Sequence, residues 1–240
     1  MFFKYSVSQE IQDWIYDSFI WAIDENIICA DTALVYPSME FFKAPNGQNI
    51  ETAYALLDDL KHILKIQDEE IELSPMNRLP DELTHEYGVL SDIAGTWQGD
   101  TQQALINYNP NLMGRPVAFI AMLAHELMHH VLHMRTSLPP GGEDVEELST
   151  DLHVITSGLG VIQMIGAEQT GWQGYMSQPS RAHALALFLE LRDIPMEDVI
   201  PSLPAISAKY LKKSVTHIRK NPEQVYELRK RLNETTGRFL

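Results

Sequence analysis

One stretch near the middle of the chain decides how the rest is interpreted: residues 117–134, VAFIAMLAHELMHHVLHM. It is apolar on nearly every face and follows Pro116, a residue that suits the first turn of a helix, so it predicts a buried helix. His125 and His129 are four residues apart and therefore lie about 40° from each other around a helix axis. Their imidazoles can thus face a single metal ion, and the ligand type favours Zn2+.

Glu126 follows the first of these histidines and would face the open side of the ion. There it could accept a proton from water and pass it to a leaving amine, while zinc lowers the pKa of the water toward about 7. Two histidines and a glutamate are costly to bury in so apolar a helix unless a metal compensates them. Satisfied core histidines are the alternative interpretation. The pattern predicts a hydrolytic zinc site with Glu126 as the catalytic residue.

A catalytic zinc needs a third protein ligand and one position left for water. His133 continues the row of histidines, but it would rise about 12 Å along the helix from His125 and could not share the ion. The metzincin pattern requires glycine and histidine where this chain has Leu132 and Arg135. That subclass is excluded, so the third ligand is expected to be a carboxylate.

Four carboxylates near the start of the next predicted helix are candidates for this third ligand: Glu143, Glu146, Glu147 and Asp151. Glu147 and Asp151 are four residues apart and share a helix face, whereas Glu146 lies nearly opposite the apolar stripe. Glu147 also fits a helix capping box that opens at Asp144. The spacing alone leaves both interpretations of Glu147 open.

The segment Glu147-Leu148-Ser149-Thr150-Asp151 resembles the Glu-x-x-x-Asp that follows His-Glu-x-x-His in gluzincin-type zincin metallopeptidases. The resemblance implies that Glu147 is the third ligand and that Asp151 accepts a hydrogen bond that orients His125. It also implies a zincin-like fold. Residues 123–133 are similar to the active-site helix of ImmA/IrrE-type regulatory proteases, although this likeness covers little more than one helix.

Around this segment the hydrophobic pattern predicts an α+β chain, rich in helices, with a small β-sheet beside the active-site helix. We expect a hairpin of residues 93–97 and 104–108, in which Ala104–Tyr108 is either an edge strand that pairs with substrate or an internal strand with no ligand. One helix is expected from Asp144 to about Ile165. A single domain, 1–240, is predicted, with an N-terminal portion (1–80), a metal-site core (81–170) and a C-terminal helical portion (171–240).

The chain is acidic, with a net charge of −15, and this disfavours binding to nucleic acid or to an anionic membrane. Residues 206–240 nevertheless hold nine Lys or Arg against three Glu. This basic tail could fold against the acidic body or dock an acidic protein partner. The lone Cys29 and the lack of an apolar leader or membrane-length apolar run favour a cytoplasmic protein.

These observations predict a cytoplasmic zinc metallopeptidase that acts on a peptide or protein substrate. The alternative is a non-catalytic zinc-binding module with a regulatory or interaction role, in which the metal only holds the fold. A hydrolase would also need a donor that stabilises the oxyanion formed during the reaction. Four residues are candidates that the sequence cannot separate: His153, Tyr175, His183 and Tyr210.

Overall fold

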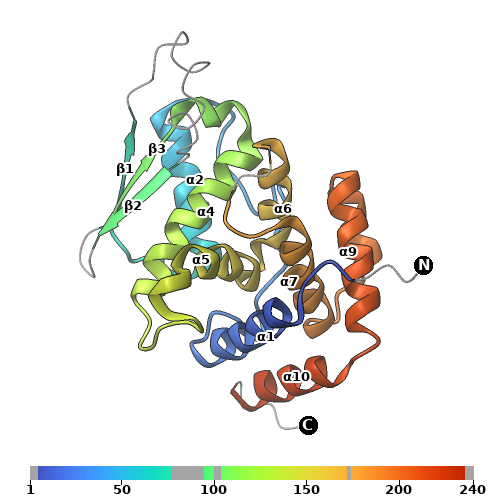
Figure 1. Ribbon diagram of the computed structural model, residues 1–240. Helices are drawn as coiled ribbons and strands as arrows, with labels where there is room; N and C mark the ends of the chain where they lie inside the picture. The colour runs from blue at the N-terminus through green and yellow to red at the C-terminus, as the bar shows by residue number, and fades with distance from the viewer. Residues whose placement is uncertain (1–4, 77–94, 100–103, 172–173, 236–240) are drawn as a thin grey trace. The chain divides into compact units, whose positions relative to one another are not determined.

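The computed structural model describes residues 5–76, 95–99, 104–171 and 174–235. This part of the chain is helix-rich and holds a small three-stranded sheet, so the predicted α+β class is confirmed (Figure 1). The chain divides into two compact units. The first unit joins Met1–Tyr36 to Arg135–Leu240, and the second unit is Pro37–Met134.

The second unit contains the sheet and the histidine-bearing helix. Its elements are α2 (Ile50–Leu64), β1 (Ile71–Pro75), β2 (Gly95–Gly99), β3 (Ala104–Tyr108), the 3-10 turn η1 (Pro110–Gly114) and α4 (Pro116–His133). Helix α4 has the predicted bounds to within one residue and starts with proline in its first turn. It packs against β2, β3 and α2, which confirms the expectation that the sheet lies beside this helix.

The strand order is β1-β3-β2, with β3 parallel to β1 and antiparallel to β2. The predicted pairing of the two hairpin strands is therefore confirmed for the described residues, and positions 93–94 of the expected strand lie outside them. Of the two alternatives for Ala104–Tyr108, the edge position is wrong and the internal position is confirmed, because this strand is bonded on both sides. Its alternate residues Ala104, Ile106 and Tyr108 are buried, which suits a central strand. Among the described strands, β2 is an edge next to α4.

The described elements of the first unit are all helices, joined by turns and loops. Its elements are α1 (Gln9–Asp24), η2 (Gly142–Val145), α5 (Glu146–Val154), η3 (Ile155–Leu159), α6 (Gly160–Gln169), α7 (Gln178–Leu191), α8 (Met196–Val199), η4 (Ile200–Ser202), α9 (Ala205–Ile218) and α10 (Glu223–Thr235). Ser8 caps the start of helix α1, since its hydroxyl accepts from Ile11 N. The almost wholly buried α7 packs against α9, α10, α6 and α1. Through this packing the N-terminal helix α1 belongs to the same unit as the C-terminal helices, whereas residues 37–80 belong to the other unit.

The single helix expected from Asp144 to about Ile165 is interrupted at Gly158. This residue has φ +93, and a π-helical turn, η3, separates α5 from α6. The Gly158 carbonyl accepts from Val35 N at 2.9 Å, and a Cβ on Gly158 would lie 2.0 Å from the Ala33 carbonyl oxygen. The chain from 33 to 35 thus approaches the helix where only glycine leaves room, and the periodicity of the helix could not show this.

Three arginines of the basic tail bind acidic groups of the first unit. Arg231 donates to Asp24 at 2.6 Å, Arg219 donates to Glu190 at 2.8 Å, and Arg229 binds Asp193. This pairing supports the interpretation that the tail folds against the acidic body. The expected acidic protein partner of this basic tail stays a prediction.

None of the helices in the described ranges combines the length and the apolar character that a membrane crossing requires.

Candidate metal centre

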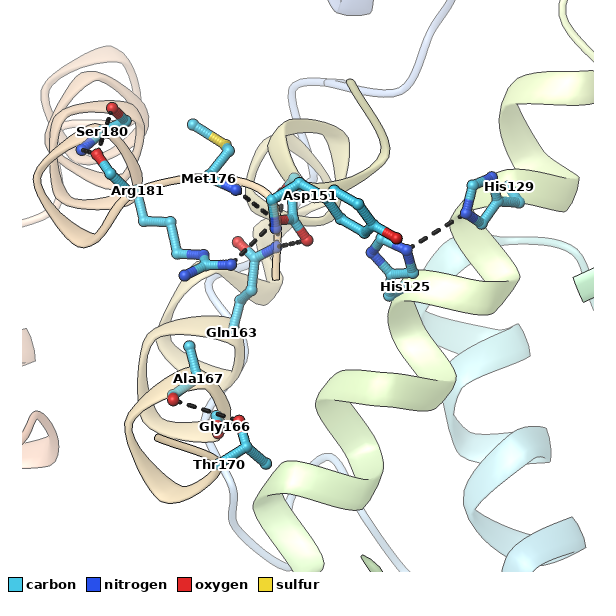
Figure 2. A network of polar contacts seen from close by, with 12 residues as sticks. His125, His129, Asp151, Gln163, Gly166, Ala167, Thr170, Met176, Ser180 and Arg181 are labelled. Atoms are coloured by element: carbon cyan, nitrogen blue, oxygen red, sulfur yellow. Dashed lines mark hydrogen bonds and ion pairs between the residues drawn. The ribbon is translucent and has the colours of Figure 1, made fainter. Parts of the chain in front are cut away.

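His125 and His129 bring their imidazoles together on one face of α4. Their Nε2 atoms are 3.3 Å apart, and the two rings are nearly perpendicular, with an interplanar angle of 82° (Figure 2). Two nitrogens bound to a tetrahedral zinc at about 2.0–2.1 Å would be separated by about 3.3–3.4 Å. The spacing of the two nitrogens is therefore the spacing that a shared tetrahedral ion requires.

Among the residues that the structure describes, one group of at least three potential ligands could hold a metal ion: His125, His129 and Glu147. One ligand atom from each residue lies within 4.8 Å of the others. All three residues are half-buried. Two imidazoles and one carboxylate form a donor set that suits zinc and related divalent ions, so the residues present fit the predicted metal.

The capping interpretation of Glu147 is not supported by the start of α5. This helix begins at Glu146 after Val145, and no side chain caps it. Asp144 lies in a 3-10 turn, η2 (142–145), and is not the residue that precedes α5. Glu147 is a half-buried residue in the first turn of α5 and is one of the three residues that could hold a metal ion.

Glu126 is buried, with 6% of its surface exposed, in the turn between the two histidines. The backbone of β2 passes beside it at Gly95. A Cβ on Gly95 would lie 3.0 Å from Glu126 Oε1 and 2.5 Å from Met122 Sδ. Any side chain at position 95 would require Met122 and Glu126 to shift, so glycine suits the close approach of this edge strand to the carboxylate.

Asp151 is 3% exposed and accepts several hydrogen bonds within the first unit (Figure 2). Its Oδ2 accepts from the backbone N–H groups of Tyr175 and Met176 at 2.8 and 2.9 Å, and from Arg181 Nη2 at 2.9 Å. Its Oδ1 accepts from Gln163 Nε2 at 3.0 Å. Asp151 is thus no solvated surface residue, and its proposed role in orienting His125 stays a prediction.

Two of the four oxyanion candidates are core residues. His153 is fully buried, and burial lowers its pKa to about 3. His183 is buried against the Tyr5 hydroxyl, 2.8 Å from its Nδ1, and its pKa is lowered to about 4, mainly by burial. Tyr175, by contrast, is 59% exposed, in the segment whose N–H groups bind Asp151. Unlike the two buried histidines, Tyr175 is accessible to a ligand.

The two buried histidines predict that the chain loses stability in mild acid. Their folded pKa values lie below the ordinary 6.5, so the unfolded chain takes up protons that the folded chain does not. Their stabilising contribution is complete above about pH 6.5 and falls as the pH drops toward the folded values. At pH 5 the expected loss is about 2 kcal/mol for each histidine.

Urea unfolding of the wild type at pH 7 and pH 5 measures this loss. A His183→Gln variant should lose less stability than the wild type over the same interval, whereas His62→Gln, at an exposed histidine, should match the wild type. Equal losses in all three proteins would show that His183 does not contribute.

The sequence did not single out Gly95, Trp97 or Arg181 as functional residues. Gly95 and Trp97 are held beside α4 by the pairing of β2, and Arg181 is thirty residues from Asp151. A glycine two residues before a tryptophan in the predicted hairpin was the one signal in the sequence.

Comparisons with protein-family models, curated proteins and solved structures found no match to this chain.

Proposed function

We propose that this chain is a zinc-dependent hydrolase, and more specifically a metallopeptidase of the gluzincin type. The observation that carries the proposal is the convergence of His125 and His129 Nε2 at 3.3 Å, with Glu147 in the same group. A structural zinc is usually closed by four protein ligands, whereas a catalytic zinc has three and keeps a position for water. The three-residue group in the described part of the chain favours the catalytic alternative.

When bound, zinc would supply a Lewis acid that lowers the pKa of water and polarises a substrate carbonyl. Glu126, next to His125, would accept the proton of the attacking water and deliver it to the leaving nitrogen. Its burial limits competition from bulk solvent and strengthens electrostatic interactions. His125, His129 and Glu147 would hold the ion.

Strand β2 gives a reason to prefer peptides over other amides. It is an edge strand among those described, and its residue Gly95 lies against Glu126. An extended peptide could add to such an edge through backbone hydrogen bonds. This substrate-binding role of β2 replaces the one expected for Ala104–Tyr108.

Tyr175 is the residue that we favour as the oxyanion donor.

A proteome-derived peptide library tests the proposed function. Zinc-loaded wild type should cleave a defined set of peptides, and Glu126→Gln, prepared and loaded in the same way, should leave that set intact. Identical peptide profiles for the wild type, the variant and a buffer control would refute the peptidase activity.

Replacement of Glu147 by alanine is expected to weaken zinc binding by more than the roughly 10–100-fold loss typical of groups outside the coordination sphere. The reason is that the variant loses one of three protein ligands. A competition titration with a zinc chelator measures the affinity. Glu146→Ala, at the exposed neighbouring carboxylate, is the matched control and should bind zinc as the wild type does. Weakened zinc binding in Glu146→Ala, together with wild-type binding in Glu147→Ala, would make Glu146 the ligand.

A further inference from the structure

One indole ring lies among three histidine rings of α4. Trp97 of β2 is parallel to His129, with an interplanar angle of 10° and ring centroids 6.2 Å apart. It is tilted against His133 at 5.5 Å and against His130 at 6.3 Å. Its Nε1 is buried and has no hydrogen-bond partner among the described residues. Trp97 is therefore placed by ring contacts rather than by a polar bond.

The strand that carries this indole is well fixed. Trp97 pairs in register with Ile106 of the central strand, and Ile106 pairs on its other side with Leu73. Residues two apart on a strand point to the same face, so Gly95 and Trp97 both face α4. Strand β2 thus lies against two proposed functional residues. Gly95 is beside Glu126, the proposed general base, and Trp97 is beside His129, a proposed ligand.

His130, which follows the proposed ligand His129 in the chain, is also held in place. His130 is 2% exposed, and its Nε2 lies 3.3 Å from Glu69 Oε2. This contact fixes the turn of α4 next to His129 from within the same unit. The remaining freedom of His129 is rotation of its imidazole about the side-chain bonds, and the parallel indole restricts that rotation.

We propose that Trp97 is a positioning residue of the metal centre, which holds the His129 imidazole in the orientation needed to bind the ion. The inference rests on the proposed metal centre and goes beyond it by assigning a role to β2. Groups that orient a metal ligand from outside the coordination sphere typically change metal affinity by about 10–100-fold. Loss of the aromatic ring at position 97 is expected to weaken zinc binding by this factor.

The test compares zinc affinity, measured by chelator competition, in Trp97→Phe, Trp97→Leu and Trp97→Ala. Phenylalanine keeps a ring and should stay within about threefold of the wild type, whereas leucine keeps apolar volume without a ring and should lose about 10–100-fold. Thr96→Ala, on the opposite face of β2, should bind zinc normally. If alanine prevents folding, the comparison of leucine with phenylalanine still decides.

The metal-free unfolding midpoints of the leucine and phenylalanine variants separate positioning from general packing. Similar midpoints with different zinc affinities would support the role of the ring. The positioning role would be refuted if Trp97→Leu bound zinc as tightly as the wild type, or if Trp97→Phe lost as much zinc affinity as Trp97→Leu. Neither result would argue against the metal centre itself. A wild-type chain that binds no zinc would refute the metal centre, and this role with it.

Discussion

Glu126→Gln is expected to lower peptide hydrolysis by about 10²–10⁴-fold, the usual contribution of a general acid–base group. Glutamine has nearly the shape of glutamate but cannot accept a proton at neutral pH. Glu126 is not a member of the ligand group, so zinc should remain stoichiometric. The variant therefore separates metal binding from catalysis, and parallel measurements of turnover and bound zinc are required.

Glu72→Gln is a suitable control for Glu126→Gln, because Glu72 is an exposed glutamate of the same unit. It should retain wild-type turnover and zinc content. Wild-type turnover in Glu126→Gln would remove Glu126 from the mechanism. A wild-type chain that binds zinc but hydrolyses nothing would instead favour the non-catalytic module.

Arg181→Ala is expected to destabilise the chain by about 3–5 kcal/mol. Arg181 is 1% exposed and donates to Asp151 Oδ2 at 2.9 Å. Removal of Arg181 would leave the buried Asp151 carboxylate without this cationic partner. The cost in free energy of unfolding is far larger than for the loss of a surface ion pair. The free energy of unfolding in urea, measured at pH 7, gives the size of the effect.

Arg231→Ala is the matched control for the buried pair. Arg231 donates two hydrogen bonds to Asp24, but both side chains are nearly half-exposed, so its loss should cost no more than about 1 kcal/mol. Equal destabilisation by the two substitutions would contradict the argument from burial. So would an Arg181→Ala protein as stable as the wild type.

The sequence predicted the features that depend on local spacing. Helix α4 follows from its apolar run and its initial proline, and the facing of His125 and His129 follows from helical geometry. The pairing of the two hairpin strands followed from the hydrophobic pattern of residues 93–97 and 104–108. The membership of Glu147 in the ligand group came from a resemblance, and the structure agrees with it.

Other features depend on contacts between distant segments and were missed. The parallel pairing of β1 with β3 places β3 in the centre, and no local pattern announces that order. The interruption at Gly158 depends on residues more than a hundred positions earlier. Asp151 and Arg181 meet only because α5 and α7 belong to one packed unit.

The most direct test of the metal centre is the zinc content of the purified chain after chelation, zinc loading and dialysis, measured by elemental mass spectrometry. The wild type should hold one equivalent of zinc, and His125→Ala and His129→Ala should each hold almost none, whereas His62→Ala should equal the wild type. No zinc in the wild type, or a full equivalent in either of the first two variants, would contradict the account.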